Sequence, residues 1–170
     1  MSIRTHKERV LAIDVRASRF GFAVLEGPEQ LVDWGLKHFR EGANAVKIPL
    51  EDKIAVLFQE IEPSTVVLKE SSRFNRKRVS MRKTILRQAQ KGGIPTWVPT
   101  NAEIKRAFPD YARNKYRIAS AVVMRFPELT YKLPGKRKIW KPEDNRMSIF
   151  DAAAAGLSYF RKQKLEVSLS

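Results

Sequence analysis

One segment near the start of the chain, VLAIDVRASRFGFAVLEG at residues 10–27, constrains the fold more than any other. The apolar run from Val10 to Asp14 indicates a buried strand, and Phe20 to Leu25 indicates a second one. The four residues from Arg16 to Arg19 are too few for anything except a hairpin turn. The chain therefore begins with two antiparallel strands, and the first of them ends on a carboxylate, a group that normally avoids apolar surroundings.

The rest of the sequence alternates between strand and helix patterns. Further strands are expected at residues 31–39, 65–70 and 94–99. Helical periodicity predicts helices at residues 50–61, 79–91, 102–107, 114–126 and 145–162, with a mobile loop at 127–141. This order predicts a layered α+β or α/β domain, with antiparallel strands at one side of the sheet and parallel strands after the crossovers. We expect a single domain over residues 1–170.

Composition and charge indicate a soluble protein that binds a polyanion. Hydrophobic residues make up 43% and charged residues 30% of the chain, and no apolar run approaches the roughly 20 residues that span a bilayer. We expect a cytoplasmic protein with no membrane partner, no small-molecule cofactor and, since it has no cysteine, no thiolate metal site. The net charge of +15, with nine basic residues between Lys69 and Lys91, favours nucleic acid as the partner over a merely solvated basic surface.

Three acids stand in apolar surroundings, where charged groups are rare unless they pair with cations or bind a metal. Asp14 ends the first strand, Glu70 ends the strand at 65–70, and Asp151 lies in the Ala-rich middle of the last helix. If the two strands are parallel neighbours, their carboxyl ends meet, and the last helix can bring Asp151 to the same point. Such a cluster would hold one or two Mg²⁺ or Mn²⁺ ions. The alternative is that each acid pairs with a Lys or Arg side chain.

Two residues that precede Asp151 each have two possible roles. Asp144, seven residues earlier, falls two turns away on the same helical face, so it is either a fourth catalytic acid or the N-cap of the helix. Ser148, three residues before Asp151, either orients a metal-bound water or is a small packing residue.

The motifs resemble, in their order along the chain, those of the RuvC-like Holliday junction resolvases of the RNase H-like superfamily. VLAIDVRASRFGFAV is similar to the opening strand and hairpin of that family, VVLKE to its fourth strand, and MSIFDAAAAGLSYF to its terminal helix. WVPTNAEIKRAF and NKYRIASAVV are similar to the segments between them. The resemblance implies an RNase H-like α/β fold, with a mixed five-stranded sheet of three antiparallel and two parallel strands flanked by helices.

The same resemblance implies a metal-dependent endonuclease that hydrolyses phosphodiesters in four-way or branched DNA, with Asp14, Glu70 and Asp151 as metal ligands. The chain departs from the family at two positions. Arg16-Ala17-Ser18 stands where the family usually has a glycine-serine pair, and Ser148 stands where it usually has Asp or His. Arg16 therefore either holds the scissile phosphate or marks a site that has stopped cutting.

Basic and aromatic residues supply the expected nucleic-acid contacts. The loop after Glu70 matches in position a family loop whose aromatic residue inserts at the junction centre, and Phe74 takes that role unless its ring folds back onto the sheet. The cations expected to contact phosphates are Arg16, Arg73, Arg76, Lys77, Arg78, Lys105, Lys115 and Arg117. The family works as a two-fold dimer, so we expect a homodimer through the helix at 79–91, with Met81, Ile85 and their neighbours in contact across the axis.

Two other functions are compatible with the sequence. The segment from Asp14 to Val24 also resembles the opening of the YqgF-like proteins, which are linked to ribosomal RNA maturation, although Glu70 favours the resolvase family. The other alternative is a protein of the same fold that binds nucleic acid without cutting it, for which Arg16 and Ser148 are the motivation.

Overall fold

The computed structural model describes residues 7–38, 48–71 and 74–170 and contains one five-stranded sheet. The strands are β1 (Val10–Val15), β2 (Arg19–Leu25), β3 (Leu31–His38), β4 (Thr65–Leu68) and β5 (Thr96–Trp97). Their order across the sheet is β3-β2-β1-β4-β5. β2 pairs antiparallel with both β1 and β3, whereas the β1–β4 and β4–β5 pairs are parallel. The predicted mixed sheet of three antiparallel and two parallel strands is therefore confirmed.

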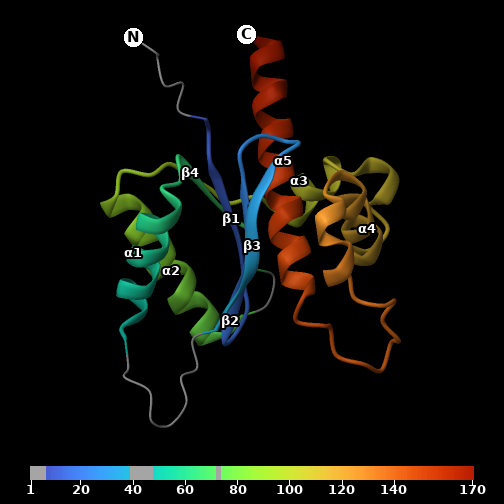
Figure 1. Ribbon diagram of the computed structural model, residues 1–170, viewed down its shortest axis with the longest axis horizontal. Helices are drawn as coiled ribbons and strands as arrows, with labels where there is room; N and C mark the ends of the chain where they lie inside the picture. The colour runs from blue at the N-terminus through green and yellow to red at the C-terminus, as the bar shows by residue number, and fades with distance from the viewer. Residues whose placement is uncertain (1–6, 39–47, 72–73) are drawn as a thin grey trace.

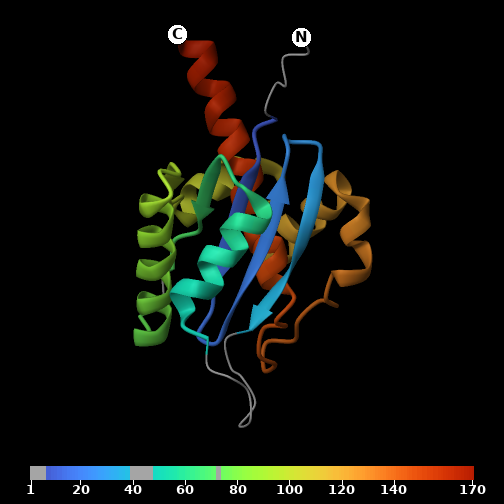
Figure 2. The same ribbon diagram turned by 60° about the vertical axis from the view of Figure 1, so that its left-hand side comes forward.

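Helices cover both faces of the sheet (Figure 1). The α-helices are α1 (Leu50–Ile61), α2 (Arg76–Lys91), α3 (Asn101–Arg106), α4 (Lys115–Arg125) and α5 (Met147–Leu169), and two 3₁₀ helices are η1 (Pro109–Tyr111) and η2 (Pro127–Lys132). Helices α1 and α2 lie on one face, and α5 crosses the other face with α3 and α4 beyond it, as Figure 2 also shows. None of the helices in the described part of the chain is long and apolar enough to span a membrane.

Side-chain alternation along β1 divides the buried residues into two layers. Leu11 and Ile13 pack with residues of α1 and α2, while Val10 and Ala12 pack with residues of α5. Asp14 continues the second series, so its side chain lies on the α5 side of the sheet.

Small residues allow α5 to lie close to the sheet. The run Ala152–Ala155 is buried, and a Cβ added at Gly156 would lie only 2.6 Å from Leu25 Cδ1. At Gly21 of β2, an added Cβ would lie 2.3 Å from the carbonyl carbon of Ser148. Because Gly21 is the cross-strand partner of Asp14, this close contact also brings the first turns of α5 to Asp14.

Helix α2 begins earlier than the sequence predicts. It starts at Arg76, because the side chain of Asn75 accepts the backbone N–H groups of Lys77 and Arg78 and so caps the helix there. The predicted strand at 94–99 is also shorter than expected, since only Thr96–Trp97 pairs with β4.

The C-terminal part of the chain contains more regular structure than predicted. Residues 127–141 are not a loop throughout, because Pro127–Lys132 forms η2, held by the fully buried side chain of Leu129. Helix α5 starts two residues later than expected and continues to Leu169, so that its C-terminal half projects beyond the sheet (Figure 1).

Replacing Gly21 with Ala is expected to destabilise the fold by about 3 kcal/mol, since the added methyl group would overlap backbone atoms of Ser148 that cannot move without shifting α5. Urea unfolding followed by circular dichroism measures the loss. Gly135→Ala is the matched control, because nothing lies within 4 Å of its added Cβ. Equal stabilities of Gly21→Ala and the wild type would contradict the close approach of α5.

Candidate functional site

The buried carboxylates of Asp14 and Asp151 meet at one side chain, Arg16. Asp14 in β1 and Asp151 in α5 are 6% and 8% exposed. Arg16 Nε donates to Asp14 Oδ2 at 2.8 Å, and Arg16 Nη2 donates to Asp151 Oδ2 at 2.7 Å. One guanidinium therefore joins two acids that come from opposite ends of the sequence.

Three further charged side chains surround this pair. Lys69 Nζ lies 3.5 Å and Lys115 Nζ lies 3.3 Å from Asp151 Oδ2. Glu143 accepts from Arg16 Nη2 at 3.0 Å and from Lys115 Nζ at 3.2 Å. We call these six residues the carboxylate cluster: Asp14, Arg16, Lys69, Lys115, Glu143 and Asp151. The cluster contains three acidic and three basic side chains, so its formal charges balance.

Burial and neighbouring charges move the pKa values of two of these acids in opposite directions. Burial, followed by repulsion from Asp151, raises the pKa of Asp14, although Arg16 and Lys69 act against the shift. Burial also acts to raise the pKa of Glu143, but the charges and hydrogen bonds of Lys115 and Arg16 outweigh it and lower that pKa. At Asp14 burial therefore outweighs the neighbouring cations, whereas at Glu143 the cations outweigh burial.

The structure does not bring Glu70 into the cluster. Ile13 of β1 pairs with Leu68 of β4, so the next residues along the two parallel strands, Asp14 and Lys69, are neighbours. Because side chains alternate, Lys69 faces α5, and Glu70, one residue later, falls on the other side, where it is exposed. In the described ranges, no three acidic or histidine side chains are arranged to hold a metal ion, so the expected three-carboxylate group is not seen.

The acid that approaches from the segment before α5 is Glu143 and not its neighbour Asp144. Asp144 instead binds Arg146, accepting its backbone N–H at 2.9 Å and its Nη2 at 2.7 Å. The hydrogen bond from the Arg146 side chain lowers the pKa of Asp144. The N-cap of α5 is Arg146, two residues after Asp144, so Asp144 is not the N-cap. Because its carboxylate binds Arg146, Asp144 is not a member of the carboxylate cluster either.

Ser148 is a packing residue. It is 1% exposed, and its Oγ donates to the carbonyl oxygen of Asn145 at 2.9 Å. The backbone of Ser148 also lies against Gly21, so this residue belongs to the contact between α5 and the sheet.

Most of the expected nucleic-acid contacts lie on the surface. Phe74 is 86% exposed, so its ring does not fold back onto the sheet. Arg76 and Lys77 are exposed at the start of α2, while Arg78 is half-buried and donates to Ser71 Oγ at 3.2 Å. Arg73, which was expected to act with them, lies outside the described residues.

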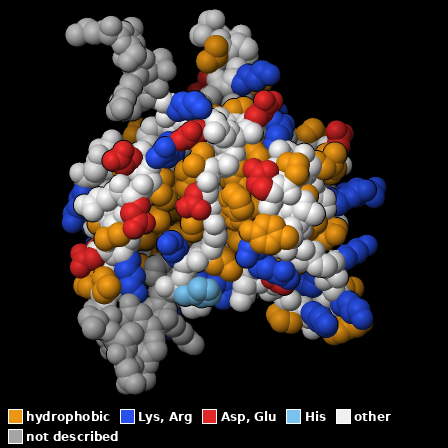
Figure 3. All heavy atoms as spheres, in the orientation of Figure 1, with side chains coloured by type: hydrophobic (Ala, Val, Ile, Leu, Met, Phe, Trp, Pro, Cys, Tyr) orange, Lys and Arg blue, Asp and Glu red, His pale blue; other side chains and the backbone are white. Residues whose placement is uncertain are grey.

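The remaining expected contacts divide between the surface and the cluster. Lys105 on α3 and Arg117 on α4 are exposed. Arg16 is half-buried and Lys115 is exposed, and both are bound to acids of the cluster. Figure 3 shows that Lys and Arg side chains also gather at the lower right of the molecule, over the segment between η2 and α5.

Helix α2 does not offer the apolar contact that was expected across a dimer axis. Met81 and Ile85 are 4% and 0% exposed and pack beneath α1 and α2 within the same chain, so they are not available to a second copy. The exposed face of α2 is basic and includes Arg76, Lys77, Lys83, Arg87 and Lys91. This face therefore suits a polyanion better than an identical helix.

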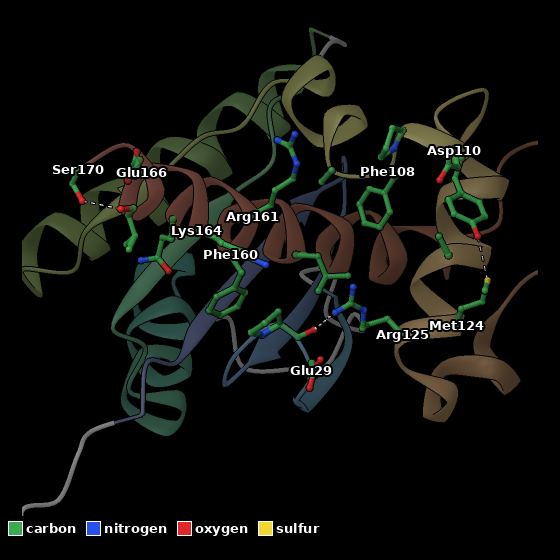
Figure 4. Close-up of a pocket in the computed structure, with 18 residues that line it drawn as sticks. Glu29, Phe108, Asp110, Met124, Arg125, Phe160, Arg161, Lys164, Glu166 and Ser170 are labelled. Atoms are coloured by element: carbon green, nitrogen blue, oxygen red, sulfur yellow. Dashed lines mark hydrogen bonds between the residues drawn. The ribbon is translucent and has the colours of Figure 1, made fainter.

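A hollow of about 1560 Å³ opens away from the cluster, between the C-terminal half of α5 and the segment that contains α3, η1 and α4 (Figure 4). Phe108 and Phe160 contribute to its apolar walls. Its charged residues are balanced, with Arg125, Arg161 and Lys164 against Glu29, Asp110 and Glu166. The hollow includes no member of the carboxylate cluster and has no excess of positive charge.

Comparison with known proteins identifies the fold. No protein-family model matches the sequence. No curated protein matches it by sequence either. Among solved structures, Thermus thermophilus RuvC aligns with a TM-score of 0.64 at 15% identity, covering 92% of this chain and 96% of that one.

Two complexes align over a similar length. T. thermophilus RuvC with a Holliday junction substrate gives a TM-score of 0.62 at 17% identity, covering 92% of this chain and 96% of that one. The Fowlpox virus resolvase with Holliday junction DNA gives 0.55 at 11% identity, covering 91% and 98%. The chain therefore has the RuvC-like RNase H fold, as its motifs predicted.

Removing the charge of Asp14 is expected to stabilise the protein in the absence of metal. The pKa of Asp14 is raised above 3.8 in the folded chain, which therefore binds the proton more tightly than the unfolded chain does. Stability is lost as the pH rises from the unfolded pKa through the folded one, so Asp14→Asn should melt above the wild type at about pH 8 in EDTA. The difference should vanish below about pH 4.

Glu143→Gln is the matched variant of opposite sign. Because the folded pKa of Glu143 is lowered from 4.5, its charge stabilises the fold at higher pH, and this contribution is lost as the pH falls through the folded pKa. The variant should melt below the wild type at about pH 8 and approach it in acid. Thermal melting followed by circular dichroism measures both variants, and an Asp14→Asn protein that melts below the wild type at high pH would contradict the expected shift.

Proposed function

We propose that this chain is an endonuclease that cuts branched nucleic acid, with four-way DNA junctions as its substrate. The proposal is carried by the meeting of two buried carboxylates, Asp14 and Asp151, at the end of the central strand of a RuvC-like fold. Closely spaced carboxylates are what metal-assisted phosphodiester hydrolysis requires of a protein. The substrate class is supported by the Holliday junction complexes of T. thermophilus RuvC and the Fowlpox virus resolvase, which have this fold.

A divalent cation fits the Asp14 and Asp151 pair by the chemistry of its donors. Both side chains offer hard carboxylate oxygens, which are the ligands that Mg²⁺ and Mn²⁺ prefer. Burial raises the pKa of Asp14 even with Arg16 and Lys69 beside it, and a bound cation would favour the charged form of this carboxylate. Asp14 and Asp151 would hold one ion, which supplies Lewis-acid polarisation of the scissile phosphate.

Arg16 acts in this proposal first as a counter-ion and then as a phosphate ligand. A guanidinium binds carboxylates and phosphates with the same forked geometry, so the two groups compete for it. When a phosphate reaches the site, Arg16 exchanges Asp14 and Asp151 for phosphate oxygens. Lys69 and Lys115 remain beside Asp151 and hold its carboxylate in place.

The surface around α2 would bind the arms of the junction. Arg76 and Lys77 are exposed near the 86% exposed Phe74, an arrangement that lets a base stack on the ring while the cations hold phosphates. A junction is resolved by two symmetric cuts, so we propose that the chain acts as a two-fold dimer. Since Met81 and Ile85 are buried within one chain, that dimer would use a surface other than the apolar side of α2.

A protein that binds the same substrate without cutting it is the second candidate, and the charge balance of the cluster favours it. Arg16, Lys69 and Lys115 match the charges of the three acids without a metal. In that case the cluster is a salt-bridge network that fixes α4 and α5 to the sheet, and only its basic surroundings take part in function.

The purified chain should nick a labelled four-way DNA junction in Mg²⁺ or Mn²⁺ but not in EDTA. Asp14→Asn and Asp151→Asn should each lower the cleavage rate by on the order of 100-fold, because each removes one of the two buried carboxylates. Gel-shift binding of the uncut junction in EDTA, measured in parallel, should change little.

Glu70→Gln is the matched control, since the same charge is removed from an acid outside the cluster. We expect it to lower cleavage less than Asp14→Asn does, and an equal loss would mean that Glu70 enters the site when metal binds. Wild-type protein that binds junctions but nicks no junction, flap or single strand in either metal would establish the non-cleaving alternative. A preference for structured RNA over the DNA junction would instead indicate the YqgF-like function.

A further inference from the structure

A second hollow, of about 600 Å³, lies beside the carboxylate cluster. One wall is the start of α4, including Lys115, and the other is the segment from Pro134 to Met147 that leads into α5. Lys115 and Glu143 line this hollow and also belong to the cluster. A ligand in the hollow would therefore lie next to Asp151.

The lining of this hollow is strongly basic. Five cations contribute to it, against the two acids Glu143 and Asp144, and they are Lys115, Lys136, Arg137, Lys138 and Lys141. The larger hollow along α5 has equal numbers of both charges. Since Glu143 and Asp144 are already bound to Arg16, Lys115 and Arg146, the four cations between residues 136 and 141 remain to attract an anion.

An exposed tryptophan accompanies these cations. Trp140 is 77% exposed, and its neighbour Ile139 is 93% exposed, so neither side chain is used in the core of this chain. Lys138 Nζ lies over the indole ring, 5.5 Å from its centroid. Trp140 stands in the sequence between Lys138 and Lys141, both of which line the hollow. An exposed aromatic ring with cations beside it is an arrangement on which an unpaired base stacks.

We infer that the segment 134–142 is a binding site for an unpaired strand of nucleic acid, with a base stacked on Trp140 and its phosphates held by the lysines and arginine of the basic hollow. A base within a duplex is already stacked on both sides, so the indole selects a strand that is open. The inference rests on the proposed function only in its substrate class, because it concerns binding and not cleavage. The shared Lys115 places this strand next to the carboxylate cluster.

Binding of a fluorescently labelled oligothymidylate, followed by anisotropy in EDTA, tests this site without any cleavage. Trp140→Ala should weaken binding by about 5- to 100-fold, which corresponds to the loss of one stacked base, while Trp140→Phe should retain most of it. Tyr131→Ala is the matched control, because Tyr131 is also exposed, at 65%, and also carries a lysine over its ring, with Lys132 Nζ 5.2 Å away. Its sequence neighbours Thr130 and Lys132 do not line the hollow, whereas Lys138 and Lys141 near Trp140 do. That control should bind as the wild type does.

The outcomes separate this inference from the proposed function. An unchanged affinity of Trp140→Ala, or an equal loss in Tyr131→Ala, would overturn the site even if the protein cuts junctions normally. Two further outcomes would show a general polyanion surface and would also overturn the site. One is an equal loss of affinity of Trp140→Ala for a blunt duplex. The other is full displacement of the oligonucleotide by polyglutamate from both the wild type and the variant. Selective loss of single-strand binding would support the site even in a protein that cleaves nothing.

Discussion

Two carboxylates buried side by side repel each other and require positive charge around them. In this chain the requirement is met by cations from three separate elements: Arg16 from the first hairpin, Lys69 from the end of β4 and Lys115 from α4. Each of these elements is therefore tied to the acids as well as to the hydrophobic core. The two layers of apolar side chains stabilise the sheet and its helices, and the salt bridges of the cluster connect the hairpin, the end of β4 and α4 to α5.

The cluster also shows a conflict between stability and function. A core that served stability alone would place an apolar side chain at position 14, and Asp14 keeps its raised pKa even after Arg16 and Lys69 approach. Natural proteins retain such groups where a ligand benefits from them, and the free energy is recovered when that ligand binds. The close packing of α5, through Gly21 and Gly156, holds the arrangement in place despite the repulsion.

Much of the fold follows from local patterns in the sequence. The apolar runs predict the strands, and Asp14 and Asp151 stand out because charge is rare in such runs. The members of the site that were missed, Lys69 and Glu143, each lie one residue from an acid that was proposed.

Choosing between Lys69 and Glu70 requires the register between β1 and β4, and a shift of one residue reverses which side chain faces α5. Choosing between Glu143 and Asp144 requires the turn before α5, which Arg146 closes on Asp144. Neither register nor turn geometry is encoded in periodicity.

The hydrogen bonds from Arg16 to Asp14 and to Asp151 differ greatly in the length of chain that they close. Asp14 and Arg16 belong to one hairpin, so this pair needs only a short loop to close, whereas the bond to Asp151 joins the first strand to the last helix. Contacts between distant parts of a chain are the slow ones to form. Asp151 lies 135 residues after Arg16, so Asp14 and Arg16 can pair within the hairpin before α5 has been synthesised. The site is thus complete only once α5 packs against the sheet, because the bond between Arg16 and Asp151 requires that contact.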